Sequence, residues 1–281
     1  ALAQALKIAI NSVYGLTSAS FENPFHDNRN KDNIVAKRGA LFMINLKHEV
    51  QKRGFVVAHI KTDSIKIPDA TPEIIQFVMD YGKMYGYIFE HEATYDRMCL
   101  VNNAVYIAKY KDGKHAGEWT ATGTQFQIPY VFKKLFSHEE ITFEDMCETK
   151  SVTSAIYIDR SPDEAAAYIN NPDMAIQSED NLVLDNGHTL QFIGKVGLFT
   201  PIKSGCGGGS LVRQNTDKNG NVKYDSVVGT KDYLWMESEM VKILGKEDCI
   251  DRRYYDALVD AAATDISKYG DFEWFVSEDP Y

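Results

Sequence analysis

Residues 7–15 carry the sequence KIAINSVYG, near the start of a chain of 281 residues. At 100° per residue, Lys7, Asn11 and Tyr14 share one face of a helix that we expect to end at Gly15. A cation and an amide on that face could bind the phosphates of a nucleotide, and the phenol ring could meet its base or sugar. The alternative is an ordinary amphipathic helix whose Asn-Ser-x-Tyr-Gly run forms a C-terminal cap.

A second informative stretch lies about fifty residues further on. Residues 55–60 (FVVAHI) predict a buried strand, and residues 64–67 (SIKI) alternate as a second strand should. The connection is short, so Asp63 is expected at or beside the tip of a tight hairpin. A carboxylate held between two strands is rigid enough to bind a metal, and carboxylates hold the magnesium ions of two-metal phosphoryl transfer. An Asp that only serves turn geometry is the competing interpretation.

Together these stretches resemble two motifs of family B DNA polymerases, and most closely those of bacteriophages and prophages. The first resembles motif B (K-x3-N-S-x-Y-G), which closes the second fingers helix. The second resembles motif C (Tyr-Gly-Asp-Thr-Asp-Ser), in which Asp63 matches the second aspartate, a catalytic metal ligand. This sequence departs from motif C at Lys61, where a cation replaces the first aspartate.

The resemblance implies a role for each matching residue. Lys7 and Asn11 would bind the triphosphate, and Tyr14 would check the nascent base pair. Asp63 would hold Mg²⁺ in a two-metal site completed by an aspartate outside this chain. Three further residues would contact primer–template DNA: Gly15, Thr62 and Ser64. Lys61 does not match the motif, and our separate hypothesis is that it contacts DNA by approaching a primer phosphate.

A third, weaker match concerns residues 103–107 (NAVYI), which lie where the family has Lys-Lys-Arg-Tyr at the primer terminus. Only Tyr106 matches. Lys109 and Lys111 could replace the missing basic residues if they share the strand face of Tyr106. A Val-Tyr-Ile strand in the core is the alternative.

The expected fold is α+β: a polymerase palm-type antiparallel sheet with packed helices, followed by a mixed α/β thumb or C-terminal domain. Residues 1–115 would form the end of the fingers and the C-terminal half of the palm. Residues 116–281 would form the thumb and a phage-specific C-terminal region. Further helices are expected from Asp32 to Gly54, from Thr71, and over residues 129–136, 137–147, 162–169, 233–244 and 254–269. Further strands are expected over residues 89–95, 104–110, 118–122, 154–158 and, interrupted by the glycines of 205–209, 182–213.

The implied activity is that of a DNA-directed DNA polymerase in phage replication, adding deoxynucleotides to a primer 3′ end. Motif A (D-x-x-S-L-Y-P) does not occur in the sequence, so the chain is expected to be part of a longer or complemented protein and inactive alone. Its expected partners are primer–template DNA, deoxynucleoside triphosphates and an upstream polymerase segment. A degenerate palm that only binds DNA or a replication partner, and an acidic protein-interaction domain, remain alternatives.

The composition sets further bounds. The net charge is −10, yet the residues through Lys61 carry +5, so a local basic lining within an acidic protein is compatible with DNA in a cleft. No apolar run is long enough for a membrane span, so a soluble intracellular protein is expected, and the resemblance implies the cytoplasm of a bacterial host. The four cysteines form no Cys-x-x-Cys pair, which predicts free thiols and no zinc site. We expect the glycine-rich residues 205–209, which lack the Walker spacing, to form a flexible surface loop.

Overall fold

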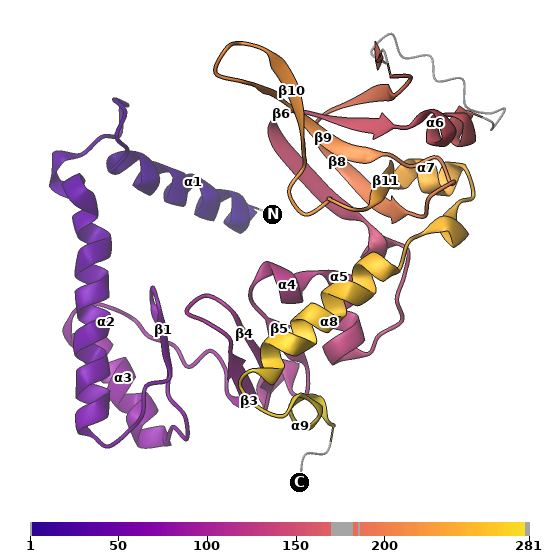
Figure 1. Cartoon of the computed structure of the whole chain (residues 1–281). Helices are drawn as coiled ribbons and strands as arrows, with labels where there is room; N and C mark the ends of the chain where they lie inside the picture. The colour runs from indigo at the N-terminus through magenta and orange to yellow at the C-terminus, as the bar shows by residue number, and fades with distance from the viewer. Residues whose placement is uncertain (1, 170–181, 185, 279–281) are drawn as a thin grey trace. The chain divides into compact units, whose positions relative to one another are not determined.

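A computed structural model describes residues 2–169, 182–184 and 186–278. These residues divide into two compact units (Figure 1). Unit 1 runs through Thr94 and includes the short segment Asn102–Ala104. Unit 2 comprises Tyr95–Val101 and the chain from Val105 onward.

Unit 1 consists of helices and one hairpin. Its elements are α1 (Leu2–Thr17), η1 (Asn28–Asn33), α2 (Ile34–Lys52), β1 (His59–Lys61), β2 (Ser64–Lys66) and α3 (Pro72–Met84). The start of α3 follows from its sequence, because the Thr71 hydroxyl accepts from the Ile74 amide and Pro72 occupies the first turn. At the end of α2, Gly54 adopts a φ of 87°, which lets the chain leave the helix.

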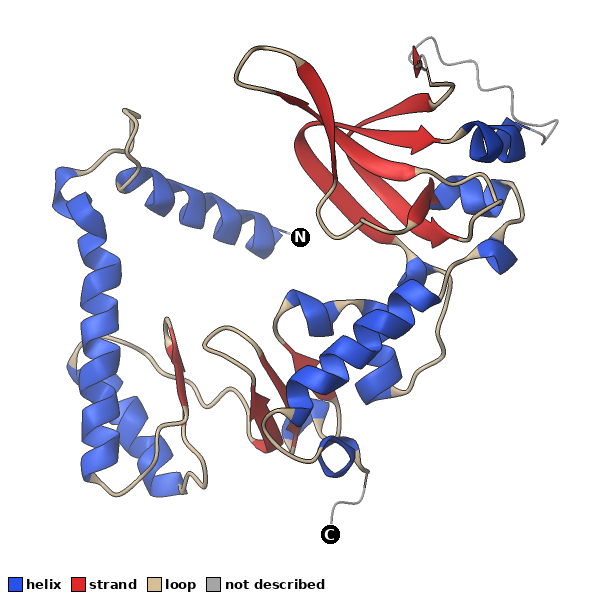
Figure 2. Cartoon of the chain, viewed as in Figure 1, coloured by secondary structure: helices blue, strands red, loops and turns tan. Residues whose placement is uncertain are grey.

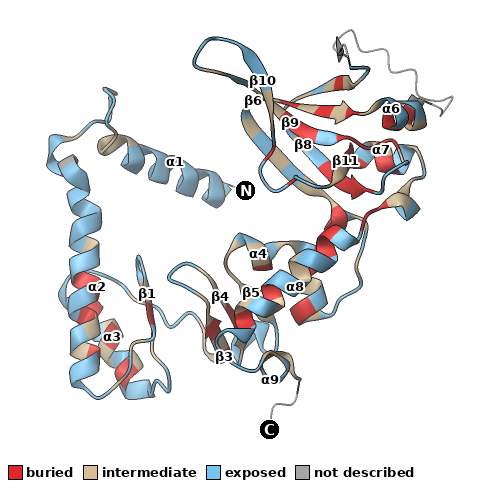
Figure 3. Ribbon diagram, in the orientation of Figure 1, coloured by how far each residue is buried: buried red, intermediate tan, exposed pale blue. Residues whose placement is uncertain are grey.

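The core of unit 1 lies between α2, α3 and the hairpin. Leu46 and Val50 of α2 and Ile74 and Val78 of α3 are buried there. Apolar side chains of the hairpin pack against the same cluster, and the Phe42 ring contacts several aromatic rings of α3 and the segment after it. By contrast, α1 buries none of its residues, as the pale blue helix in Figure 3 shows.

Unit 2 begins with a three-stranded antiparallel sheet in the order β3-β4-β5. Figure 2 draws the strands of the chain in red. The strands are β3 (Tyr95–Leu100), β4 (Tyr106–Tyr110) and β5 (Trp119–Ala121), with η2 (Gly113–His115) in the β4–β5 connection. Three short helical segments follow: α4 (Thr124–Gln127), α5 (Pro129–Phe132) and the π-helical η3 (Lys133–Ser137). Ile107, Phe126 and Val131 are fully buried in the core that these elements share with the C-terminal helices.

The second sheet of unit 2 has six strands in the antiparallel order β10-β9-β6-β8-β11, with β7 paired to β8. Its strands are β6 (Glu148–Arg160), β7 (Leu182–Val183), β8 (Thr189–Ile202), β9 (Ser210–Thr216), β10 (Val222–Ser226) and β11 (Leu234–Glu237). The remaining helices of unit 2 are η4 (Glu144–Met146), α6 (Pro162–Ile169), α7 (Ser238–Ile243), η5 (Glu247–Cys249), α8 (Arg253–Ser267) and α9 (Phe272–Val276).

Helix α8 joins the two cores of unit 2. Tyr254 and Tyr255 in its first turn pack into the core under the six-stranded sheet, together with the fully buried Trp235. Ala262 and Ile266 in its last turns pack into the core under the three-stranded sheet. The red segments along α8 in Figure 3 mark this burial, so both sheets depend on one helix.

The α+β class predicted from the sequence is confirmed, with antiparallel sheets in both units. The second part is not mixed α/β: every strand pairing recorded in the described chain is antiparallel. The boundary expected after residue 115 would fall between β4 and β5, which are hydrogen-bonded neighbours. Contacts instead divide the chain at Tyr95.

Several predicted elements were wrong. Residues 89–94 form no strand, and residues 137–147 form no continuous helix. The helix expected from residue 233 begins only at Ser238, because Leu234–Glu237 pairs with β8 and buries Trp235. Tertiary pairing therefore overrides the helical pattern of that stretch.

Candidate functional site

The hairpin of unit 1 presents Asp63 as the sequence predicts. Lys61 of β1 pairs with Ser64 of β2, so only Thr62 and Asp63 form the turn. The Asp63 amide donates to the Lys61 carbonyl at 2.6 Å, and Thr62 has a φ of 51°, which together describe a γ-turn. Asp63 is exposed at its tip.

Thr62 is an unusual residue at this position. A β-branched side chain rarely adopts positive φ, because its Cβ crowds the backbone, and the cost is about 1–3 kcal/mol. Such strain persists only where the surroundings fix the conformation, and it is common at functional sites. The turn therefore holds Asp63 in one geometry instead of leaving it on a relaxed loop.

The strands below the turn are anchored from both sides. Ile60 and Ile65, which face each other across the hairpin, pack against the core formed by α2 and α3. Above them, the Ser64 hydroxyl donates to the Lys61 carbonyl at 3.2 Å and accepts from the Lys66 ammonium at 3.0 Å. This packing gives the carboxylate the rigid support that a ligand to a metal or phosphate requires.

The segment Asn102–Ala104 belongs to the same site. The side chain of His59 is buried, and the distance from its Nε2 to the Asn103 carbonyl oxygen is 2.9 Å. The Lys61 ammonium donates to the Ala104 carbonyl oxygen at 3.4 Å. The hairpin base is thus tied to a segment more than forty residues away in the sequence. Pattern reading did not identify His59, because a histidine in an apolar strand gives no local sign of a distant partner.

Two lysines lie near the Asp63 carboxylate. Burial lowers the pKa of the Lys66 ammonium, and the nearby charge of Lys61 lowers it further. The carboxylates of Glu92 and Asp63 act in the opposite direction and raise the pKa of Lys66. Two lysines therefore lie within electrostatic reach of one another beside Asp63. Ser64 and Lys66 share a face of β2 because they are two residues apart, and this alternation was the signal that could have identified Lys66.

These residues form at most a partial magnesium site. Among the residues that the structure describes, no cluster of three or more His, Cys, Asp or Glu side chains could hold a metal ion. Mg²⁺ is usually bound through one or two carboxylates together with substrate phosphates. Asp63 can supply one such ligand, and Lys61 supplies none. The described chain alone does not fit a complete two-metal site.

The predicted nucleotide-binding face lies on α1. Lys7 and Asn11 are exposed, and in the described structure neither side chain makes a hydrogen bond or ion pair. The Tyr14 hydroxyl donates to Asn33 Oδ1 at 2.8 Å, so its ring is held toward η1. The expected break at Gly15 was wrong: α1 continues to Thr17. The helix ends at Thr17, whose hydroxyl accepts a hydrogen bond from the Asn30 side-chain amide at 2.7 Å.

Lys7, Asn11 and Tyr14 do not contact Asp63 through any hydrogen bond or ion pair recorded for the described residues. Within unit 1 the structure brings together the hairpin residues Lys61, Thr62, Asp63 and Ser64. It separately places the motif B residues on α1. The sequence placed both sets correctly on a hairpin and a helix, and their joint action remains a prediction.

Tyr106 and Lys109 lie on β4, in unit 2. They are three residues apart on a regular strand, so their side chains point to opposite faces. Lys109 therefore cannot replace a basic residue on the Tyr106 face. Lys111 follows the last residue of β4, and the same alternation places it on the face opposite Tyr106 as well. Lys109 instead lies 5.7 Å from the centre of the Trp119 ring, and the Tyr106 ring lies 6.4 Å from that of Tyr95.

The glycine-rich loop of unit 2 is not the flexible loop expected. The Glu164 carboxylate, which is buried, accepts hydrogen bonds from the Gly205 amide (2.5 Å), the Gly207 amide (2.7 Å) and the Ser204 hydroxyl (3.1 Å). The loop thus encloses an anion, and that anion is the protein's own side chain. A phosphate could bind these donors only by displacing Glu164.

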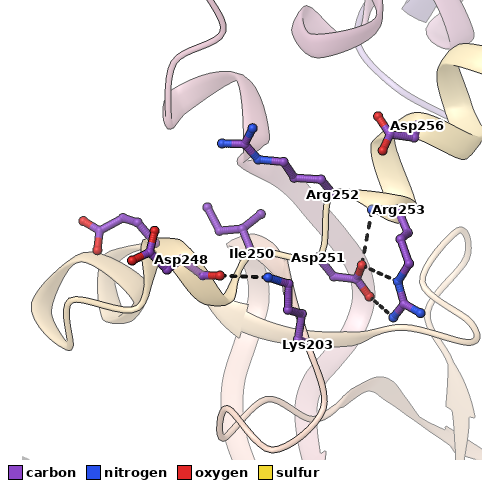
Figure 4. Close-up of a pocket in the computed structure, with 8 residues that line it drawn as sticks. Lys203, Asp248, Ile250, Asp251, Arg252, Arg253 and Asp256 are labelled. Atoms are coloured by element: carbon purple, nitrogen blue, oxygen red, sulfur yellow. Dashed lines mark hydrogen bonds and ion pairs between the residues drawn. The ribbon is translucent and has the colours of Figure 1, made fainter.

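A pocket of unit 2 lies around the start of α8 (Figure 4). Its volume is about 480 Å³, and one ion pair joins two of the charged side chains that line it. Arg253 makes a two-pronged ion pair with Asp251, and the Lys203 ammonium donates to the Asp248 carbonyl at 2.9 Å. Four acidic and three basic side chains line it, so the pocket has no clear preference for a charged ligand.

Comparison with known proteins leaves the motifs as the basis for assignment. No protein-family model, curated protein or solved structure matches this chain. None of the helices described in the structure is long and apolar enough to cross a membrane. The geometry of the hairpin and of α1 must therefore be interpreted from their own chemistry.

Proposed function

We propose that this chain is part of a DNA-directed DNA polymerase of the family B type, one that acts in phage DNA replication in the cytoplasm of a bacterial host. It would contribute the end of the fingers, the metal-binding hairpin of the palm and the C-terminal region. The observation that carries the proposal is Asp63: an exposed carboxylate on a strained two-residue turn, at the position of the motif C aspartate.

In this function the residues of the chain would position the substrates. Lys7 and Asn11, exposed on one face of α1, would bind the triphosphate, and Tyr14 would lie beside the nascent pair. Asp63 would contribute one ligand to Mg²⁺, which when bound would stabilise charge on the attacking and leaving oxygens. The rigid hairpin would supply orientation, which accounts for a large share of catalysis in phosphoryl transfer.

The proposal assigns the other carboxylate to a separate segment, because motif A does not occur in this sequence. Its test is primer extension by the purified chain, with and without the upstream segment that carries motif A. We expect extension only when both are present. Steady incorporation by the chain alone, or no incorporation by the combined protein, would contradict the proposal.

A second function, a non-catalytic palm that binds DNA, is favoured by one observation. Lys61 stands where motif C has its first aspartate, and its ammonium is directed to the Ala104 carbonyl at 3.4 Å. Under this alternative the chain binds a fluorescent primer–template, binding weakens as salt rises, and the combined protein incorporates nothing. An acidic protein-interaction domain would bind no DNA at any salt concentration.

A further inference from the structure

Two cysteines that are distant in sequence lie together in unit 2. Cys206 lies in the loop between β8 and β9, and Cys249 is the last residue of η5. The Lys203 amide donates to the Cys249 carbonyl at 2.9 Å, which joins the start of the loop to η5. The Lys246 ammonium donates to the Cys206 carbonyl at 2.5 Å, and the Cys249 amide donates to the Lys246 carbonyl at 2.9 Å.

These bonds fix both cysteines relative to one another. Glu164 holds the residues on either side of Cys206 through the Gly205 and Gly207 amides. At Gly207, whose φ is 89°, an added Cβ would lie 2.9 Å from the backbone of Tyr168, so the loop has little room to shift. Cys206 is therefore held in place by contacts from α6 and from the segment around η5.

The two side chains meet at the edge of the core. Both pack against the apolar cluster beneath the six-stranded sheet. Burial raises the pKa of Cys206 to about 11, and the hydrogen bond to the Cys249 thiol contributes to the increase. Both cysteines are free thiols and only partly buried, so a small reagent can reach them.

We propose that Cys206 and Cys249 are a redox site that closes to an intramolecular disulfide when it meets a small disulfide oxidant such as oxidised glutathione. This inference is independent of the polymerase proposal. The thiolate of Cys249 attacks one sulfur of the oxidant, which forms a mixed disulfide and releases the first glutathione thiol. The Cys206 sulfur then attacks Cys249 Sγ and releases the second glutathione. Two electrons pass to the oxidant, and both cysteine protons end on the two glutathione thiols.

The order of attack follows from the neighbouring groups. Burial and the neighbouring thiol favour the protonated form of Cys206, and the thiolate is the nucleophile in disulfide exchange. Cys206 is therefore poorly suited to attack first, and the proposal assigns the first attack to Cys249. Cys206 resolves the mixed disulfide because it is already in contact.

The other two cysteines lack such a partner. Cys99 is buried in the core under the three-stranded sheet. The Cys147 thiol donates to the Phe143 carbonyl at 3.3 Å and lies 3.6 Å from the Thr200 hydroxyl. Oxidation should thus be selective for one pair of the four, which makes the proposal testable within a single protein.

The experiment treats the whole chain with oxidised glutathione, alkylates the remaining thiols, and maps disulfides by peptide mass spectrometry. We expect one cross-linked pair, Cys206 with Cys249. Cys249→Ser should abolish it, the matched control Cys147→Ser should retain it, and Cys206→Ser should leave a stable glutathione adduct on Cys249. Tryptophan fluorescence checks that each variant is folded, and the mapping of the unsubstituted chain needs no variant.

Three results would overturn the inference. One is a mixture of pairings that includes Cys99 or Cys147. Another is a yield of the Cys206–Cys249 disulfide in urea equal to the yield in the folded chain, which would show that the fold does not select this pair. The third is full alkylation of Cys206 and Cys249 after prolonged exposure to the oxidant.

Discussion

Replacement of Glu164 by Gln tests whether the glycine-rich loop is held by a buried carboxylate. In the structure one carboxylate oxygen accepts from Ser204 and Gly205, and the other accepts from Gly207. Gln has nearly the same volume but only one acceptor oxygen. If that oxygen keeps Ser204 and Gly205, the new amide group faces the buried Gly207 N–H, donor against donor.

The cost can be worked out from these bonds. A hydrogen bond to a charged group contributes about 1.5–3 kcal/mol, whereas a neutral one contributes about 0.5–1.5 kcal/mol. Glu164→Gln loses one charged bond outright and weakens two others, while it avoids the cost of burying a charge. We therefore expect the free energy of unfolding of unit 2 to fall by about 2–4 kcal/mol.

Urea unfolding followed by tryptophan fluorescence measures this directly. The three tryptophans, Trp119, Trp235 and Trp274, all belong to unit 2, so the signal does not report on unit 1. Glu239→Gln is the matched control, because it removes the same charge from an exposed position on α7. A loss below about 0.5 kcal/mol for Glu164→Gln, equal to that of the control, would refute the reasoning.

Three other predictions concern single residues. Thr62→Asn should slow hydrogen exchange at the hairpin turn by an amount equivalent to about 1 kcal/mol, because Asn tolerates the φ of 51° better than Thr does. Unchanged exchange would show that the turn is not strained. Burial raises the pKa of Glu237 in the folded protein above its ordinary value of 4.5. The protonated Glu237 therefore stabilises the fold fully below pH 4.5, and this stabilisation is lost as the pH rises through the pKa of the folded protein. Glu237→Gln should remove this loss, and parallel pH profiles for the variant and the original chain would contradict the assignment. Arg97→Lys should speed hydrogen exchange over residues 272–278 and lower the free energy of unfolding by about 1–3 kcal/mol. The reason is that the Arg97 guanidinium donates to the Phe275 and Ser277 carbonyls at 3.1 and 2.9 Å. Unchanged exchange in this segment would show that those hydrogen bonds do not hold it in place.

Local signals in the sequence predicted many elements well. The cap at Thr71, the proline after it and the glycine at 54 each act through neighbouring backbone, and helices α2 and α3 have the expected limits within a few residues. Residues 162–169 likewise form the expected helix. Errors arose where distant partners decide the structure. Leu234–Glu237 is a strand because β8 offers it an edge, and no pattern within the segment indicates that edge.

The candidate site shows the same division. The tight turn at Asp63 follows from the length of two short strands, so it could be predicted. The carbonyls of Asn103 and Ala104, which contact His59 and Lys61, could not, because they come from a separate segment. The contact of Cys206 with Cys249 and the role of Glu164 in the glycine loop also depend on the fold. Sequence spacing alone suggested unpaired thiols and a flexible loop.

The central claim is that Asp63 is the catalytic carboxylate that this chain contributes to a polymerase. Its most direct test is the single-turnover rate of nucleotide incorporation by the chain combined with the upstream motif A segment, for Asp63→Asn and Asp69→Asn. Asp69 is the matched control, because it too is an exposed Asp of unit 1, and its φ of 51° is a conformation that Asn tolerates. We expect Asp63→Asn to lower the rate by at least about a thousandfold, a loss of about 4 kcal/mol in transition-state stabilisation, while Asp69→Asn leaves it nearly unchanged. Equal rates for the two variants would contradict the claim.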